Sequence, residues 1–350
     1  MDTCRSIING RIPGENRKIV LQMDRIVREN SQSPLVSIIT PAYNRAPFVD
    51  ETIQSVLTQD YPNFEYIVLD DGSKDSTREV LARYEGRIRW DSHANMGEVR
   101  TVNKGFEMAK GEILCVVNSD DPLLPGAISC VVEVMMRHPE VVVAYPDWDM
   151  IDAEGKGISH RQTFEYDYVN MVRWFHCVPG PGAFFRKSVV TALGGRDAQF
   201  RYVSDFDFWL RAGLLGPFKR VPKTLATFRR HSDGASSKDQ GIAMAEEHIR
   251  LARKLFSIPD LPPGVAAVKR EAFGSAYYTA ALNLGDASSR LKKWYLIKAL
   301  ASAPSKYLFQ EYRERLIGPI VFALTGPKAH PFLAKFCKVF PLREGIRCPH

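Results

Sequence analysis

Residues 113–121 read ILCVVNSDD, an apolar run of five residues that ends abruptly in a polar turn with two adjacent carboxylates. Such a run is typical of a strand that is buried on both faces of a sheet. The change in polarity places Asp120 and Asp121 at the carboxyl end of this strand, the edge where open α/β sheets bind ligands. Neighbouring carboxylates repel each other unless a proton, a cation or water relieves them. The pair therefore indicates a hard divalent metal such as Mg²⁺ or Mn²⁺, with a solvated turn before the next helix as the alternative.

The sequence on both sides of this stretch alternates between strand and helix patterns. Strands are expected at 35–40, 64–69, 88–90, 113–117 and 141–145, and helices at 47–59, 76–84, 99–109 and 126–138. This order predicts an α/β fold with a single mostly parallel (mixed) sheet, flanked by helices and joined by right-handed crossovers.

Three of the predicted strands end in polar residues that a parallel sheet would bring to one edge. PAYNR (41–45) follows the first strand, Asp70 and Asp71 follow the second, and NSDD (118–121) ends the central one. No GxGxxG follows the first strand and the chain has no Walker lysine loop, so the pattern differs from a dinucleotide or P-loop site. Phosphate at this edge would have to be neutralised by a metal and by basic side chains.

Glycine, proline and aromatic residues dominate the chain beyond residue 147. The segment 174–186, WFHCVPGPGAFFR, places Gly180 and Gly182 beside aromatic rings. This suits either a sugar-binding wall, in which the two glycines would contact the diphosphate or the acceptor, or plain packing. Asp205 then begins a predicted helix, SDFDFWLR (204–211), whose N-terminal dipoles would keep its carboxylate ionised. A general base needs that ionised form, although an ordinary N-cap is the competing interpretation.

A basic, polar loop follows at FRRHSDGASS (228–237). Arg229 or Arg230 would pair with a diphosphate or contact the acceptor, and His231 would contact a metal or a phosphate. A loop histidine that is merely exposed is the alternative for His231.

The net charge of +7 over 350 residues becomes informative once it is located. Residues 251–350 hold 16 Lys and Arg against 6 Asp and Glu, a balance of +10, which leaves −3 for residues 1–250. The tail shows no interleaved aromatic RNA motif, zinc finger or helix-turn-helix, so nucleic acid is not an expected partner. The basic tail suggests anionic phospholipid as a partner, bound through a peripheral contact. A solvated helical face is the alternative.

Composition divides the chain into an N-terminal arm at 1–33, an α/β domain at 34–240 and a basic helical region at 241–350. Six scattered cysteines without a CxxC pair indicate reduced thiols, and the N-terminus lacks the apolar core of a signal peptide. No segment reaches about 18 apolar residues. We therefore expect a cytoplasmic protein that is at most peripheral on the inner face of a membrane, where the short apolar stretch 317–324 would lie.

Seven blocks of this sequence together resemble family 2 of the inverting glycosyltransferases, which have the GT-A fold. They are VSIITPAYNR (36–45), VLDDGSKDST (68–77), NMGEVRTVNKGFEMAKGE (95–112), NSDDPLLPG (118–126), GAFFRKS (182–188), SDFDFWLR (204–211) and FRRH (228–231). The resemblance covers roughly residues 34–237 and leaves the N-terminal arm and the basic helical region outside it.

The resemblance implies a role for each matching residue. The nucleotide would be bound by Pro41, Tyr43, Arg45, Asp71, Asn95, Asn103, Asn118, Ser119 and Asp120, with Asp71 accepting from a ring N–H of the base. Mn²⁺ or Mg²⁺ would be bound by Asp120 and Asp121, with His231 as a further candidate ligand. The sequence departs from the family's fuller acidic pattern at Asn118, where aspartate is common, and this leaves open which aspartate ligates the metal directly.

The implied reaction moves a sugar from a nucleotide-diphosphate sugar to a hydroxyl of a glycan or lipid-linked glycan, as in polysaccharide biosynthesis. Asp205 matches the family's general base, which takes the proton of the attacking hydroxyl. Attack on the anomeric carbon from the face opposite the nucleotide inverts the configuration in one displacement.

Two other functions stay open at this point. A nucleotidyltransferase that makes nucleotide sugars would use a related sheet, but it usually needs a Gly-rich basic loop after the first strand, which PAYNR (41–45) does not resemble. A non-catalytic member of the family would bind a glycan or a membrane complex through its basic tail.

Overall fold

The computed structural model describes residues 33–232, 234, 241–284 and 289–302. The described residues divide into two compact units, one with residues 33–232, 234 and 253–266 and the other with residues 241–252, 267–284 and 289–302. Within the described ranges, every helix is too short or too polar to cross a membrane. Most of the predicted N-terminal arm and the apolar stretch 317–324 lie outside the described residues.

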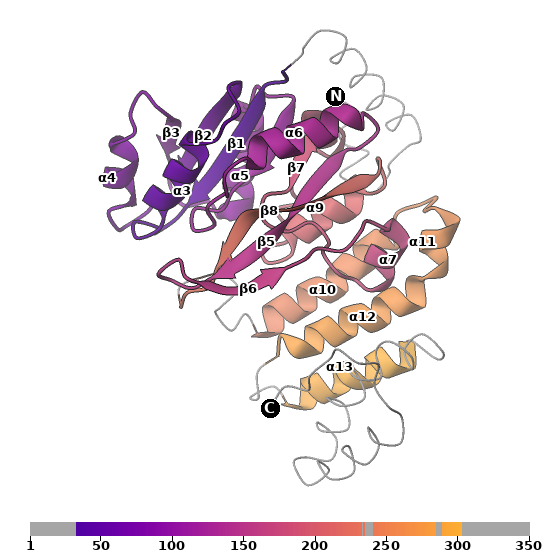
Figure 1. Ribbon diagram of the computed structural model, residues 1–350. Helices are drawn as coiled ribbons and strands as arrows, with labels where there is room; N and C mark the ends of the chain where they lie inside the picture. The colour runs from indigo at the N-terminus through magenta and orange to yellow at the C-terminus, as the bar shows by residue number, and fades with distance from the viewer. Residues whose placement is uncertain (1–32, 233, 235–240, 285–288, 303–350) are drawn as a thin grey trace. The chain divides into compact units, whose positions relative to one another are not determined.

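The described part of the first unit is built on one mixed sheet of eight strands (Figure 1). These are β1 (Val36–Ala42), β2 (Phe64–Asp70), β3 (Arg89–Ser92), β4 (Ile113–Val116), β5 (Val143–Ile151), β6 (Gly157–Arg161), β7 (Phe184–Arg186) and β8 (Phe218–Arg229). Their order is β3-β2-β1-β4-β7-β5-β6, and β8 pairs with β5. The first four strands of this order run parallel, whereas β7 is antiparallel to both β4 and β5. The predicted mostly parallel, mixed sheet is confirmed.

Strand β1 pairs with β2 on one side and β4 on the other, and its seven residues are all buried. Its register sets Val36 beside Ile113 of β4 on one side and beside Phe64 of β2 on the other. The polar members of β1 have partners, since Thr40 Oγ1 and Tyr66 Oη lie 3.0 Å apart. The carboxyl ends of β1, β2 and β4 therefore meet at one edge of the sheet, as the sequence pattern predicted.

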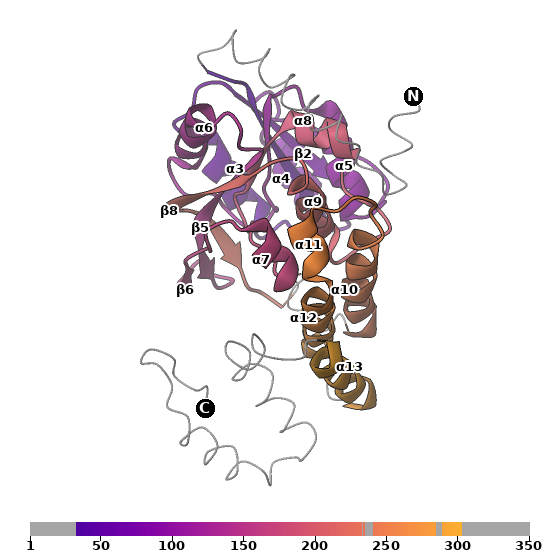
Figure 2. The same ribbon diagram turned by 90° about the vertical axis from the view of Figure 1, so that its right-hand side faces the viewer.

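Helices cover both faces of this sheet. They are α3 (Val49–Leu57), α4 (Thr77–Ala82), α5 (Glu98–Met108), α6 (Ala127–Arg137), α7 (Tyr168–Arg173), α8 (Lys187–Leu193) and α9 (Ser204–Ala212). Ile38 joins a buried cluster with Ile53 of α3 and Val131 of α6. On the other face the Phe106 ring of α5 lies 6.0 Å from the Phe208 ring of α9. Figure 2 shows α6 on one side of the sheet and α5 with α8 on the other.

The carboxyl-terminal part of the described chain is helical, which confirms the predicted helical extension over these residues. Its helices are α10 (Gly241–Leu255), α11 (Pro263–Ala267), α12 (Lys269–Leu282) and α13 (Ser289–Ser302). Within the second unit, α12 and α13 pack through Tyr278 and Ala281 against Leu296 and Ala299.

Candidate functional site

The loops that leave β1 and β2 are joined by hydrogen bonds. Asn44 N donates to Ser73 Oγ at 2.9 Å, and Lys74 N donates back to Asn44 Oδ1 at 2.8 Å. Arg45 N donates to Thr77 Oγ1 at 2.8 Å. Asn44 has a positive φ of 53°, a conformation that asparagine tolerates better than most residues. The two loops therefore form one rigid rim at the carboxyl edge of the sheet.

Asp71 connects this rim to the loop before α5. Its buried carboxylate accepts from Met96 N at 2.7 Å and from Gly97 N at 3.0 Å, while Asn95 Nδ2 donates to the Asp71 carbonyl oxygen at 2.9 Å. Tyr43, in the rim, is 40% exposed. The contact of Asp71 with a base stays a prediction, because the two backbone N–H groups already engage both of its oxygens.

The two aspartates after β4 have different environments. Asp121 is buried, and its two oxygens accept from Arg229 N at 2.7 Å and from Asn118 Nδ2 at 2.9 Å. Desolvation and the neighbouring charge of Asp120 raise the pKa of Asp121 to about 7. Asp120 is more open, and its Oδ2 lies 3.1 Å from Arg45 Nε and 3.0 Å from His231 Nε2.

These contacts show which side chains suit a divalent metal. Both oxygens of Asp121 are engaged inside the protein, so Asp120 is the more accessible carboxylate, and His231 is adjacent to it. The described residues contain no cluster of three or more His, Cys, Asp or Glu able to hold a metal by themselves. Mg²⁺ commonly uses one or two protein ligands together with substrate phosphates. The Asp120 carboxylate suits a metal of that kind, whereas the imidazole of His231, which is hydrogen-bonded to Asp120, suits Mn²⁺ better than Mg²⁺.

Arg229, at the end of β8, is buried among oxygen atoms. Its Nε donates to the Asp120 carbonyl oxygen at 3.0 Å, and its Nη1 donates to the carbonyl oxygens of Asp152 and Ala153 at 3.1 and 3.0 Å. Its Nη2 lies 2.6 Å from Glu51 Oε2, and its side chain is 1% exposed. A direct contact between Arg229 and a diphosphate would require these bonds to break, whereas Arg230 is exposed.

His231 is held in place rather than merely exposed. Its ring is buried against the Phe48 ring, with the centroids 4.4 Å apart, and its Nε2 contacts Asp120. The guanidinium carbon of Arg229 lies over the same Phe48 ring, 5.3 Å from its centroid. The structure therefore brings His231 and Asp120 together from positions 111 residues apart.

Asp205 lies in the first turn of α9, where Val203 occupies the N-cap position, so the N-cap interpretation of Asp205 is wrong. Its Oδ1 accepts from Phe206 N at 2.7 Å. Glu98, at the start of α5, is a side chain whose pKa is affected by the charges of both Asp205 and Asp120. Desolvation raises the pKa of Glu98, Arg196 opposes this shift, and the charges of Asp205 and Asp120 add to it. Glu98 is nevertheless 54% exposed, so it faces water among surrounding carboxylates rather than a sealed interior.

Sequence reasoning missed Glu98 and Arg196, although Glu98 lies within the block NMGEVRTVNKG (95–105) and Arg196 follows a Gly-Gly pair. Asn103, a predicted nucleotide ligand, uses its amide on the backbone of Arg196 instead, with two hydrogen bonds of 2.8 Å. Its nucleotide contact stays a prediction.

Gly180 and Gly182 lie where side chains would collide with neighbours. A Cβ at Gly180 would be 2.7 Å from Trp148 Nε1, and one at Gly182 would be 2.7 Å from Ala226 Cβ. Packing thus accounts for both glycines, and their predicted contact with the acceptor or diphosphate stays a prediction.

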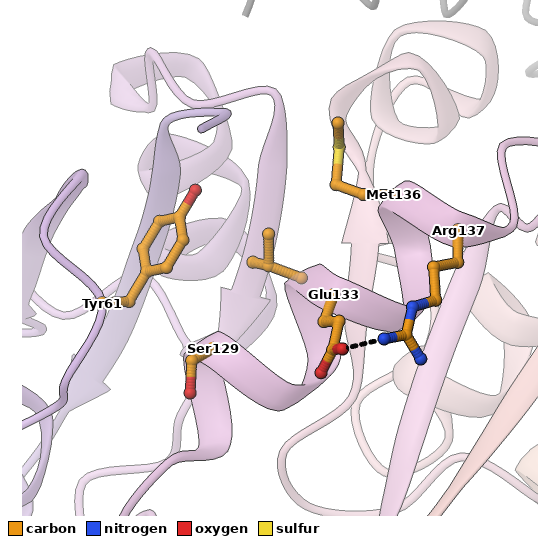
Figure 3. A pocket seen from close by; sticks show the side chains of 6 residues that line it. Tyr61, Ser129, Glu133, Met136 and Arg137 are labelled. Carbon is orange, nitrogen blue, oxygen red and sulfur yellow. Dashed lines mark hydrogen bonds and ion pairs between the residues drawn. The ribbon is translucent and has the colours of Figure 1, made fainter. Parts of the chain in front are cut away.

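A surface pocket of about 410 Å³ lies elsewhere, beside α6 (Figure 3). Tyr61, Ser129 and Met136 help to line it, and the Glu133–Arg137 ion pair borders it. The predicted site residues are not among those that line this pocket.

Comparisons with known proteins point in one direction. The family described as "Glycosyl transferase family 2" matches residues 37–194. An uncharacterized glycosyltransferase of Rickettsia typhi is 29% identical over 192 residues, which are 53% of this chain and 60% of that protein. The match thus spans less than two thirds of that relative's length.

Two solved structures share the fold at low sequence identity. The S. aureus TarS 1-349 complex with UDP-GlcNAc has a TM-score of 0.61 and 18% identity, covering 77% of this chain and 81% of that one. The mannosyltransferase PcManGT of Pyrobaculum calidifontis, in complex with GDP-Man and Mn²⁺, has a TM-score of 0.55 and 17% identity, covering 93% and 95%. Both support the GT-A fold for the described sheet.

Proposed function

We propose that this protein, whose residues 37–194 belong to glycosyl transferase family 2, is an inverting glycosyltransferase that uses a nucleotide-diphosphate sugar as donor. The acceptor is a hydroxyl group of a glycan or lipid-linked glycan. The observation that carries the proposal is the Asp120 carboxylate at the carboxyl edge of the sheet, whose Oδ2 lies 3.1 Å from Arg45 Nε and 3.0 Å from His231 Nε2. A catalytic base and a diphosphate-binding residue must lie on opposite sides of the same sugar, and the charges of Asp205 and Asp120, which both raise the pKa of Glu98, support this arrangement.

The donor nucleotide has a suitable place at the rim formed by the loops after β1 and β2. The half-exposed ring of Tyr43 offers a stacking surface for the base, and Asp71 and Asn95 lie at the same edge. Basic groups at Asp120 suit the diphosphate, because Arg45 and His231 both contact its Oδ2. The exposed Arg230 can add a further positive charge.

In the transfer step, Asp205 accepts the proton of the acceptor hydroxyl, and the hydroxyl oxygen attacks the anomeric carbon as the bond to the diphosphate breaks. Arg45 and the exposed Arg230 stabilise the charge that grows on the departing diphosphate. A divalent cation, if bound by Asp120 and His231, would supply additional electrostatic stabilisation of that leaving group. The presence of GDP-Man and Mn²⁺ in the complex of the mannosyltransferase PcManGT supports a metal of this type here.

A screen of nucleotide sugars tests the function. The full chain is incubated with each sugar in the presence of Mn²⁺, and thermal stabilisation and slow donor hydrolysis are measured. Free nucleoside diphosphate is the expected product of donor hydrolysis. Release of pyrophosphate from a nucleoside triphosphate would instead identify a nucleotidyltransferase, and binding without any hydrolysis or transfer would identify a non-catalytic family member.

We also propose that the second unit provides a peripheral contact with anionic membranes. In α13, Trp294, Ile297 and Leu300 are 51%, 44% and 40% exposed. The helix also carries Lys292 and Lys293 and has no acidic residue. Exposed aromatic and aliphatic side chains next to lysines suit the interface of an anionic bilayer.

A further inference from the structure

The turn between α8 and α9 holds Arg196 in a fixed backbone conformation. Asn103 of α5 accepts from Arg196 N and donates to the Arg196 carbonyl oxygen, both at 2.8 Å. From the other side, Arg211 of α9 donates to the carbonyl oxygens of Leu193 and Gly195 at 3.1 and 2.9 Å. Gly195 has a φ of 89°, and a Cβ there would lie 2.6 Å from Asn103 Oδ1, so this close approach requires glycine.

The Arg196 side chain is nine-tenths buried and yet incompletely bonded. It is 10% exposed, and its Nε has no hydrogen-bond partner within the part of the chain that the structure describes. Its Nη1 lies 3.4 Å from Glu98 Oε1, a long contact with a half-exposed partner. A buried donor without an acceptor costs about 1–3 kcal/mol, so such a group in a native protein requires an explanation, and a bound water, ion or ligand is one.

Arg196 and the proposed base act electrostatically on the same two side chains. Asp205 and Arg196 both act on Glu98 from α5 and on Cys177 from the loop before β7. Two side chains from separate elements therefore have Asp205 and Arg196 as common neighbours. The charge of Asp120, where the diphosphate is expected to bind, also raises the pKa of Glu98. These shared electrostatic effects support a position of the Glu98–Arg196 pair beside a sugar bound between the diphosphate and Asp205.

The charges of this region favour a neutral ligand group. A carboxylate or phosphate beside Arg196 would be repelled by Glu98, Asp205 and Asp120. A hydroxyl group has no such penalty, since its oxygen accepts from Arg196 Nε and its proton is donated to Glu98. The ion pair thus offers one donor and one acceptor, the combination that distinguishes sugar hydroxyls by their position.

The geometry points to Glu98 and Arg196 as the pair that selects the transferred sugar by bonding one of its hydroxyl groups. This inference rests on the proposed function, because it takes the ligand to be the sugar of a nucleotide-sugar donor. It assigns these residues to donor specificity and not to binding of the nucleotide.

Binding measurements separate the sugar from the nucleotide. Isothermal titration of the full chain with Mn²⁺ would compare UDP and GDP with UDP-glucose, UDP-galactose, UDP-GlcNAc, GDP-mannose and UDP-glucuronate. Arg196→Gln, Arg196→Lys and Glu98→Gln are expected to weaken binding of the preferred neutral nucleotide sugar by about tenfold or more. Their affinity for UDP and GDP is expected to match the wild type. Arg196→Lys keeps the charge but removes the Nε donor, so it is expected to behave like Arg196→Gln.

Lys104→Gln is the matched control, because it removes a positive charge from the same helix α5 at an exposed ion pair with Asp91. Circular dichroism and thermal unfolding of each variant show whether it folds. If folded Arg196 and Glu98 variants bind the neutral nucleotide sugars as tightly as Lys104→Gln does, the inference is overturned while the proposed function stands. The inference would also be overturned if the Arg196 and Glu98 variants lost binding of UDP-glucuronate but kept binding of the neutral nucleotide sugars. That result would indicate an anion site. If the wild type binds neither nucleotides nor nucleotide sugars, the proposed function fails and the inference fails with it.

Discussion

Replacing Arg229 by methionine is the most direct test of how the acidic edge is held together. Methionine keeps much of the unbranched side-chain volume but removes all the guanidinium donors. The backbone N–H of residue 229 remains, so its 2.7 Å bond to Asp121 Oδ1 is preserved. The substitution therefore isolates the side-chain contacts with the Asp120 loop, the turn after β5 and α3.

The expected loss of stability follows from what the substitution leaves behind. The carbonyl oxygens of Asp120, Asp152 and Ala153 lose their donor, at roughly 1 kcal/mol net for each hydrogen bond. Glu51 loses its partner as well, but its side chain is 55% exposed and water can solvate it, so this part is worth about 0–1 kcal/mol. We expect Arg229→Met to lower the free energy of unfolding by about 3–4 kcal/mol.

Urea unfolding followed by tryptophan fluorescence measures this change. Trp148 is a suitable reporter because its ring lies 5.7 Å from the Phe228 ring, next to the substituted residue. If the free energy of unfolding falls by about 2–3 kcal/mol per molar urea, the urea concentration at the midpoint of unfolding is expected to fall by more than about 1 M. The control is Arg83→Met, which removes a surface ion pair with Asp50 whose partners are 62% and 49% exposed.

Arg83→Met is expected to change the free energy of unfolding by less than about 1 kcal/mol. If Arg229→Met shifts the midpoint no more than this control does, the contacts around Arg229 do not stabilise the site. That result would indicate that the guanidinium of Arg229 is free to contact a ligand.

Three further changes test other parts of the molecule. Asp205→Asn is expected to keep the affinity for the nucleotide sugar and to reduce transfer by about a hundredfold or more, and retained transfer by a folded variant would remove Asp205 from the mechanism. Asp147→Asn tests a buried ion pair with Arg220 Nη2 at 2.6 Å. Desolvation alone would raise the pKa of Asp147, but the bonds from Arg220 and its other partners outweigh it and lower the pKa. The wild type is thus expected to exceed Asp147→Asn in stability by on the order of 3 kcal/mol at pH 7, with the gap closing as the pH falls below about 4, and an equal gap at pH 3 would contradict this. Trp294→Ala is expected to reduce co-sedimentation with anionic liposomes at low salt several-fold, whereas a wild type that does not sediment with them would reject the membrane contact.

The central part of the fold follows from local patterns that the sequence displays openly. The apolar run 113–117 became β4 at Ile113–Val116, and the helical spacing at 126–138 became α6 at Ala127–Arg137. The strand expected at 141–145 is longer, because β5 continues to Ile151, and it is separated from β4 by the short antiparallel β7. Three residues among prolines, glycines and aromatics carry too little periodicity to predict β7.

The composition of the acidic edge could likewise be predicted, whereas the partners of its side chains could not. The order of strands and the polar residues at their ends determined that Asp71, Asp120 and Asp121 share one edge, because parallel strands align their carboxyl ends. Only the tertiary structure decided that Asp121 is buried under Arg229, that His231 contacts Asp120, and that Asn103 holds Arg196. Those pairs are separated by 93 to 111 residues. Periodicity records which face of an element is buried, but the partner of a polar side chain depends on which distant backbone the packing brings within about 3 Å of it.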